Sequence, residues 1–531
     1  MYTMTALTDQ VDQLFAAWDK PDTPGCVLAV IQNGEIAYSR AYGMADLERN
    51  VPLSVASVLD LGSTGKQFTA MLMLLLEQKG LLSLTDSIQK YIPELPDYGK
   101  VITIQHLIYH TSGLRDYTTL MYTANKPFEN RYDDHELFDL IVRQKNVNFP
   151  PGEEFLYSNT GYLLLGVIAQ RVGGKSYPDL VRETILEPLG MKHTTFNDTF
   201  KRIVKNRALA YSPVEGGFET DISFCGGYGD GALLSTVGDL LLWDRNFYDN
   251  HLGTGGQELI QRMLTLGTLN SGKELDYAFG LFIREHKGLQ LVSHGGAWAG
   301  YRAEMLRFPD QHLSVICLAN LANLSPSTLA LQVAELYLTD QLTEPAPSAA
   351  PTTPADQPVA INVSGFIGSY RSTNGGSLVE ITPTESGLSM EIMGYSFAVQ
   401  AVNDTTLKTV DAPIDIEVTA QGDDTLAVSL QAQAPSIFHR LAVAAAQAIT
   451  PGDYYSDELD ITYHLTLDGE QPFVQRGYAP KEALKPISGN LYASGFLIFE
   501  FSRDAGGEVE GFDLFADRVV NLRFKRQASS S

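Results

Sequence analysis

The hydrophobic positions near the start of the chain form two short runs around an Asn-Gly pair. Residues 26–31 and 36–42 are apolar enough for strands, and Asn33-Gly34 lies between them. Asn-Gly favours the two-residue turn that joins antiparallel strands, because both residues tolerate a positive φ. The pattern therefore predicts a β-hairpin. Further strand-like runs return much later, at residues 289–292, 304–308 and 313–318.

The middle of the chain has the spacing of helices. From Ser63 onward, apolar residues at Phe68, Met71, Leu72 and Leu75 share one helical face. Helical patterns alternate with loops from there to the late strands. Early and late strands that flank a helical middle predict an α/β (α+β) domain, in which an antiparallel sheet carries a helical subdomain.

A proline-rich segment divides the chain. Residues 344–358 hold five prolines among Ala, Ser and Thr, which is typical of a stiff, extended linker. A single hydrophobic core rarely grows beyond about 300 residues, so a chain of 531 residues also predicts several domains. We expect a catalytic domain over residues 1–343 and a linker over residues 344–361.

The region after the linker is rich in strand and turn patterns and contains a weak internal repeat. Residues 368–372 (GSYRS) resemble residues 452–456 (GDYYS). The repeat predicts two small antiparallel β-barrel domains, over residues 362–443 and 450–531. One larger barrel is the alternative.

Composition narrows the classes of partner. The net charge of −25 repels phosphate backbones, so we expect no nucleic-acid partner. The first twenty residues lack the basic and apolar regions of a signal peptide. The apolar run at residues 70–76 is far shorter than the ~20 residues of a membrane helix. We therefore expect no membrane partner and a cytoplasmic location, or a periplasmic one if a leader has been removed.

The chain offers little for a metal or another cofactor, and we expect neither. Its three cysteines are far apart and odd in number, so they predict neither a disulfide framework nor a Cys-x-x-Cys site. His106 and His110 could share a helix face, but Leu107 stands where zinc proteases carry glutamate. We expect structural or capping roles for both histidines. A phosphate loop around Lys66 is excluded by Asp60 and Gln67.

Two Ser-x-x-Lys strings are present, and their contexts differ. Ser63 opens the strong apolar helix, so Lys66 shares its face and can reach its hydroxyl. Ser87 and Lys90 lie in a polar helix start, where a capping role for the serine is expected. A serine hydroxyl needs a base to become a nucleophile, and a buried lysine can supply one. A lysine that reaches solvent is the alternative for Lys66.

Two further motifs favour the catalytic interpretation. Tyr157-Ser158-Asn159 precedes an apolar helix, so its two polar ends can point into one cleft. His294-Gly295-Gly296-Ala297 follows a strand-like run, and its glycines allow a substrate to approach the strand edge closely.

In this order the three motifs resemble those of the penicillin-recognising, β-lactamase-like serine hydrolases. That family includes class C β-lactamases and related esterases, DD-peptidases and D-aminopeptidases. Residues 110–114 (HTSGL) and 229–236 (GDGALLST) also resemble strings of the family, and the match covers roughly residues 8–340.

The chain is most similar to the D-aminopeptidase branch, whose members carry two C-terminal β-barrels. Residues 112–117 and 455–460 resemble strings of that branch. In the branch, a loop of the last domain reaches into the cleft. The resemblance assigns that role here to residues 476–486, with Tyr478 as a substrate-binding residue.

The resemblance implies an acyl-enzyme on Ser63, with Lys66 or Tyr157 as the base. It places Asn159 and His294 among the catalytic side chains. It assigns the oxyanion hole to the backbone N–H groups of Ser63 and Ala297, and substrate binding to Gly295, Gly296 and Ala297. The usual acidic deacylation base has no strong candidate.

His294 bears on the substrate, because many β-lactamases and carboxypeptidases carry lysine at this place. A histidine is mostly neutral near pH 7, so substrates without a carboxylate there are favoured. We expect a D-aminopeptidase or D-amino-acid amidase that takes small peptides, amides or esters. A carboxylesterase, a weak class C-like β-lactamase or DD-peptidase, and a non-catalytic penicillin-binding sensor are the alternatives. The sequence leaves open whether the chain forms a homo-oligomer.

Overall fold

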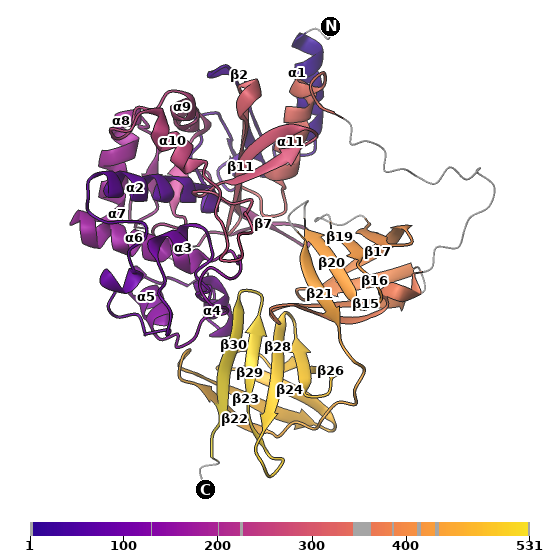
Figure 1. The fold of residues 1–531 in the computed structure, drawn as a ribbon. Helices are drawn as coiled ribbons and strands as arrows, with labels where there is room; N and C mark the ends of the chain where they lie inside the picture. Colours follow the sequence, from indigo (N-terminus) through magenta and orange to yellow (C-terminus); the bar gives the residue numbers. More distant parts are fainter. Residues whose placement is uncertain are drawn as a thin grey trace, which may run out of the picture. The chain divides into compact units, whose positions relative to one another are not determined.

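The computed structural model describes residues 4–128, 130–199, 201–223, 227–343, 363–384, 387–410, 416–430 and 435–528. The chain forms two compact units. The first contains residues 1–113, 128–139 and 149–350, and the second contains residues 114–127, 140–148 and 351–531. The predicted linker, residues 344–361, lies outside the described residues. Figure 1 shows the chain coloured along its sequence.

A six-stranded antiparallel sheet organises the first unit. Its strand order is β10-β11-β12-β13-β1-β2. The predicted hairpin is present as β1 and β2, and Asn33 and Gly34 between them have positive φ angles of 53° and 75°. The strands are β1 (Cys26–Gln32), β2 (Glu35–Tyr42), β10 (Phe282–His286), β11 (Leu289–Trp298), β12 (Tyr301–Phe308) and β13 (Leu313–Ala319).

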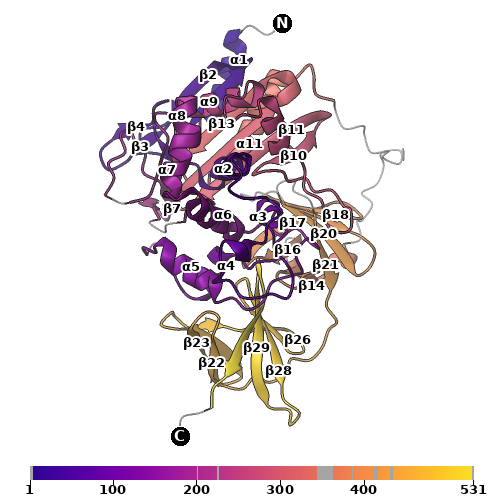
Figure 2. The ribbon, with the colours of Figure 1, turned by 60° about the vertical axis from the view of Figure 1, so that its left-hand side comes forward.

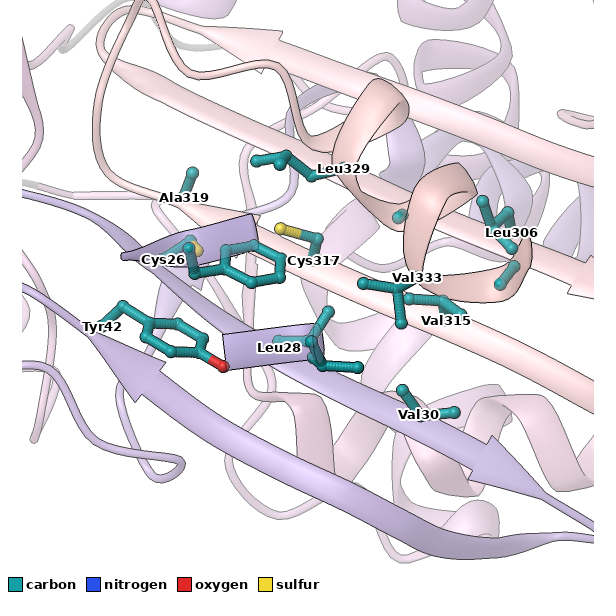
Figure 3. Close-up of a cluster of buried hydrophobic side chains, with 14 of the residues drawn as sticks. Cys26, Leu28, Val30, Tyr42, Leu306, Val315, Cys317, Ala319, Leu329 and Val333 are labelled. Carbon is teal, nitrogen blue, oxygen red and sulfur yellow. The ribbon is translucent and has the colours of Figure 1, made fainter. Parts of the chain in front are cut away.

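One face of this sheet packs against α1 (Met4–Phe15) and α11 (Pro326–Leu338). Alternate residues of the strands point into this core, among them Leu28, Cys317 and Val315, and Val333 meets them from α11 (Figure 3). The two described cysteines, Cys26 and Cys317, are buried free thiols, and burial raises the pKa of Cys26 well above its usual value. Cys225 lies outside the described residues.

The helical part of the first unit surrounds α2 (Lys66–Gln78), in which every residue from Lys66 to Leu76 is buried. Helices α6 and α7 contact α2, and α3 contacts α6 (Figure 2). The helices are α3 (Ile104–Ile108), α5 (Asp134–Val142), α6 (Asn159–Gly173), α7 (Tyr177–Val181), α8 (Glu187–Leu189), α9 (Val237–Tyr248) and α10 (Gln257–Met263), with α5 continuing into the second unit.

Three small antiparallel sheets complete the first unit. In one of them, β5 (Leu59–Asp60) and β6 (Thr195–Phe196) flank β9 (Leu233–Ser235). Strand β5 directly precedes the turn that carries Ser63. The other two sheets are hairpins, formed by β3 (Met44–Asp46) with β4 (Val51–Pro52) and by β7 (Tyr211–Val214) with β8 (Gly217–Thr220).

The second unit contains two separate β-structures, so the single larger barrel is wrong and the predicted fold class is confirmed. Strands β14 to β21 form a closed antiparallel barrel, and strands β22 to β30 form a nine-stranded antiparallel sheet. The repeated strings are the first strands, β14 (Gly368–Ser372) and β22 (Gly452–Ser456). Each pairs with the last strand of its own set, β21 or β30. This pairing closes the barrel, whereas the nine-stranded sheet keeps β25 and β26 as its edges.

The remaining strands of the second unit are short and follow one another along the chain. In the barrel they are β15 (Leu378–Thr384), β16 (Gly387–Ile392), β17 (Tyr395–Asn403), β18 (Thr406–Thr409), β19 (Ile416–Ala420), β20 (Thr425–Leu430) and β21 (Ser436–Arg440). In the sheet they are β23 (Ile461–Asp468), β24 (Gln471–Arg476), β25 (Glu482–Ala483), β26 (Lys485–Ser488), β27 (Leu491–Ser494), β28 (Leu497–Arg503), β29 (Val509–Ala516) and β30 (Val519–Arg526).

Two segments from early in the chain fold with the second unit. One carries α4 (Tyr117–Thr123), whose last carbonyl accepts a hydrogen bond of 2.5 Å from the Tyr463 hydroxyl. Arg476 donates to the Tyr122 carbonyl at 2.9 Å.

None of the described helices has the length and hydropathy of a membrane span.

Candidate active site

Ser63 lies in a short 3₁₀ turn, Gly62–Gly65, that runs directly into α2. Gly62 has a positive φ of 49°, and a Cβ there would lie 2.7 Å from the backbone nitrogen of Ala297. Only glycine fits both conditions. The turn therefore brings the backbone on either side of Ser63 against β11.

The Lys66 side chain is fully buried, and its terminal nitrogen contacts three oxygen atoms. Nζ lies 2.9 Å from Ser63 Oγ, 2.8 Å from Asn159 Oδ1 and 2.8 Å from the Asp230 carbonyl. The two carbonyl oxygens can only accept, so each takes one N–H group of Lys66. The remaining position on the nitrogen then faces the serine hydroxyl. This arrangement suits proton transfer between Ser63 and Lys66. The contacts also explain how Lys66 is buried, because each of its donors has a partner.

The second Ser-x-x-Lys string has a different environment. Lys90 pairs with Asp86 at 2.8 Å, and the Ser87 hydroxyl donates to Gln89 Oε1 at 2.7 Å. Ser87 holds the N-cap position of a 3₁₀ turn, but its side chain makes no capping hydrogen bond. The predicted capping role of the Ser87 side chain is therefore wrong, because its hydroxyl bonds to the Gln89 side chain and to no backbone N–H of the turn.

Tyr157 is a half-buried side chain whose hydroxyl oxygen is buried. Its hydroxyl has no hydrogen-bond partner among the described residues, and its ring centroid lies 5.0 Å from Lys66 Nζ. A buried polar atom without a partner costs about 1–3 kcal/mol, and such atoms are typical of positions that meet a substrate or a water.

His110 packs against the Tyr157 ring and binds the backbone of the next residue. Its ring is 4.2 Å from the Tyr157 ring, centroid to centroid, and its Nδ1 accepts a 3.1 Å hydrogen bond from the Ser158 backbone N–H. The backbone of His110 has a positive φ of 58°, which is strained for a non-glycine residue. His106 caps α3 instead, through a capping box with Thr103, so its predicted capping role is confirmed.

His294 is buried, with 3% of its surface exposed, and both of its ring nitrogens are engaged by the protein. Nδ1 lies 2.6 Å from the Gly295 carbonyl, and Nε2 lies 3.1 Å from the Tyr277 hydroxyl. Burial, helped by the positive charges of Lys66 and Arg284, lowers the pKa of His294 to about 3. The side chain is therefore neutral at physiological pH.

The glycines after His294 allow β11 to lie against the turn that carries Ser63. A Cβ on Gly296 would lie 1.9 Å from the Leu61 carbonyl oxygen. Thr64 Oγ1 donates to the His294 carbonyl at 3.0 Å. Together these contacts bring Ala297 against Gly62, the residue before Ser63.

Tyr478 is fully exposed and belongs to the second unit, in the turn between β24 and β25. Its assignment to the substrate site stays a prediction.

In the described part of the chain, no group of three His, Cys, Asp or Glu residues could hold a metal ion.

The site also contains contacts that sequence reasoning missed. The Asp230 carbonyl holds Lys66, and the string at residues 229–236 was a signal for it. Tyr277 had no such signal, because a lone tyrosine outside the motifs resembles any core residue.

Comparison with known proteins agrees with this geometry. The family model described as Beta-lactamase matches residues 11–338. The chain belongs to the β-lactamase family. Penicillin-binding protein 4* of Bacillus subtilis is 31% identical over 71% of this chain and 85% of its own length.

Two further proteins extend the comparison to the second unit. A D-aminopeptidase of Brucella canis is 27% identical over 95% of this chain and 96% of its own length. The octameric penicillin-binding protein homologue of Pyrococcus abyssi has a similar fold, with a TM-score of 0.57, 24% identity, and coverage of 82% of this chain and 100% of its own. The chain is a serine hydrolase on a β-lactamase fold with C-terminal β-barrels.

Proposed function

We propose that this hydrolase cleaves the amide bond that follows an N-terminal residue, as a D-aminopeptidase or a D-amino-acid amidase does. The observation that carries the proposal is the neutral, enclosed His294 at the place where carboxylate-binding relatives hold a lysine. Similarity to a D-aminopeptidase along 95% of the chain supports it independently.

In the first step, Ser63 Oγ attacks the substrate carbonyl and its proton passes to Lys66 or Tyr157. The 2.9 Å contact with Nζ supports Lys66 as the immediate acceptor. The N–H groups of Ser63 and Ala297 stabilise the oxyanion, and each such donor is typically worth about 2.7–4 kcal/mol of barrier.

In the second step, the leaving amine takes a proton and departs. The free hydroxyl of Tyr157 supports this residue as the donor, and as the group that then activates water against the acyl-enzyme. Asn159 holds Lys66 through its carbonyl oxygen, and the resemblance to the family supports a second role for Asn159 in orienting the substrate amide.

The electrostatics of the site disfavour a substrate carboxylate beside His294. A neutral histidine supplies no fixed charge, and the Lys66 nitrogen is already held by three oxygens. An anionic group there would lose its hydration without gaining a partner. This argument favours aminopeptidase or amidase chemistry over DD-carboxypeptidase chemistry. Carboxylesterase activity remains the second candidate, since an ester also lacks the carboxylate.

The test compares four substrates on one enzyme preparation: D-alanine p-nitroanilide, its L enantiomer, p-nitrophenyl butyrate and nitrocefin. We expect the D-anilide to be hydrolysed with the highest kcat/KM. Ser63→Ala should abolish turnover, and Ser87→Ala, in the other Ser-x-x-Lys string, should preserve it. Faster hydrolysis of the butyrate would favour the esterase, and turnover by Ser63→Ala would contradict the mechanism. Binding of penicillin without turnover of any substrate would indicate a sensor.

Two further parts of the proposal concern the second unit and assembly. We propose that the loop at residues 476–486 restricts the substrate through Tyr478, on the basis of the resemblance to D-aminopeptidases. An octameric homologue raises the prospect of a homo-oligomer, which sedimentation of the purified protein would test.

A further inference from the structure

Tyr277 is a buried tyrosine outside the three motifs, and its hydroxyl contacts His294. None of its surface is exposed, and its oxygen lies 3.1 Å from His294 Nε2. The chain reaches this position between α10 and β10, where Tyr277 pairs with Phe282 in an isolated antiparallel bridge. The tyrosine is therefore held by its backbone as well as by its ring.

The direction of the hydrogen bonds around His294 follows from what each partner can do. The Gly295 carbonyl can only accept, so the 2.6 Å contact requires a proton on Nδ1. A neutral ring then has a lone pair on Nε2, and the contact with Tyr277 requires the tyrosine to donate. Tyr162, the tyrosine beside it, donates its own proton to the Ile108 carbonyl at 3.0 Å. The Tyr277 hydroxyl also forms a hydrogen bond with the Tyr162 hydroxyl, so the Tyr162 oxygen competes with His294 Nε2 for the Tyr277 proton.

We infer that Tyr277 is a positioning residue that holds His294 in the Nδ1–H tautomer, and that His294 in turn fixes the Gly295 carbonyl and the backbone leading to Ala297. The inference rests on the proposed function, because it concerns the oxyanion donor of that site. His294 is then a positioning residue too, and it is not a group that touches substrate, because neither ring nitrogen is left for a ligand.

The contacts of this segment show what the tautomer controls. The His294 carbonyl accepts from Thr64, and Gly296 packs on the Leu61 carbonyl. A proton on Nε2 instead of Nδ1 would place two acceptors, Nδ1 and the Gly295 carbonyl, 2.6 Å apart. The Gly295 peptide would have to rotate, and the Ala297 N–H two residues later would turn away from the reacting carbonyl.

The same arrangement determines the substrate class. His294 has a ring whose donor and acceptor are both used within the protein. The His294 side chain therefore offers a substrate neither a charge nor a free hydrogen-bonding group. It suits an uncharged amide or an apolar side chain rather than a carboxylate.

A core role for Tyr277 is the competing explanation, because its ring also packs 4.7 Å from the rings of His110 and Phe282. Tyr277→Phe separates the two, since it keeps the ring and removes only the donor. The matched control is Tyr109→Phe, another buried tyrosine that loses one hydroxyl hydrogen bond, of 3.0 Å to the Thr265 carbonyl, outside the site.

The experiment measures the rate at which a fluorophosphonate modifies Ser63 in both variants, together with the ¹⁵N spectrum of the histidine rings. The signal of His294 is assigned by its loss in His294→Gln. We expect Tyr277→Phe to react about tenfold to a hundredfold more slowly, as partial loss of one oxyanion donor predicts, and to lose the Nδ1–H signature. Tyr109→Phe should keep both the rate and the signature.

An unchanged rate and an unchanged tautomer in folded Tyr277→Phe would overturn the inference. If that variant does not fold, the wild-type spectrum decides: His294 as the Nε2–H tautomer, or protonated at pH 7, would also overturn it. Failure of the wild type to hydrolyse the D-anilide would contradict the proposed function instead, because the fluorophosphonate rate needs neither an amide nor a D residue.

Discussion

The Arg115 guanidinium and the Glu458 carboxylate form a buried ion pair across 343 residues of sequence. Their closest atoms are 2.8 Å apart, and their side chains are 0% and 4% exposed. Arg115 also donates to the carbonyls of Val520 and Asn521. The pair therefore ties the segment after Gly113 to the last β-sheet, within the second unit.

Glu458→Gln should destabilise the protein strongly, because it leaves a buried guanidinium without its counter-charge. Breaking a buried pair costs about 3–5 kcal/mol, and Glu458 also accepts from the Lys145 backbone N–H at 2.6 Å. Denaturant unfolding measures the change. The control is Glu510→Gln, whose partly exposed pair with Arg523 should contribute less than about 1 kcal/mol. Equal effects of the two substitutions would contradict this account.

Gly296→Ala should impair acylation, since the added Cβ would lie 1.9 Å from the Leu61 carbonyl and 3.0 Å from Thr64 Oγ1. The strand or the turn beside Ser63 must then shift, and overpacking of this kind costs about 1–3 kcal/mol. Stopped-flow acylation rates and thermal unfolding report the two effects. Gly217→Ala, in a strand of the same unit with nothing within 4 Å of its Cβ, should leave both unchanged. A wild-type acylation rate in Gly296→Ala would show that this contact is not needed.

The three motifs could be predicted because each depends on short strings whose side chains do the chemistry. The contacts that hold them could not. Asp230 binds Lys66 through a backbone carbonyl, which any residue possesses, and Tyr277 resembles a core residue until its hydroxyl is placed. The fold of the second unit followed from its repeat. The inclusion of residues 114–127 in that unit did not, because the partner of Arg115 is too distant in sequence to be recognised.

Glu304 should make stability depend on pH. Burial raises its pKa from 4.5 to about 7, although Ser327 donates a hydrogen bond to it. Between these values the unfolded chain has lost the proton that the folded chain keeps, so stability falls as the pH rises, by up to about 1.4 kcal/mol per unit. Glu304→Gln removes this term. As the pH rises from 4.5 to 7, we expect the variant to gain stability relative to the wild type. If the unfolding free energies of the two proteins change with pH in the same way, the pKa of Glu304 lies outside this range.

Tyr478→Ala should change substrate affinity without changing the fold. The side chain is fully exposed, and such substitutions usually alter stability by less than about 0.5 kcal/mol. If the loop restricts the substrate, KM for the D-anilide should rise or larger substrates should be accepted. Tyr395→Ala, an exposed tyrosine on β17 of the barrel, is the control. Identical kinetics in both variants would remove Tyr478 from the substrate site.

The central claim is that one hydroxyl becomes acylated because Lys66, Tyr157 and the β11 backbone converge on it. The most direct test is the intact mass of the protein after reaction with a fluorophosphonate and with penicillin, followed by peptide mapping of the adduct. The account predicts one adduct per chain, on Ser63, and none in Lys66→Arg, whose guanidinium cannot accept the proton. An adduct on Ser87 or any other residue, or an unmodified Ser63 in an enzyme that turns over substrate, would contradict it.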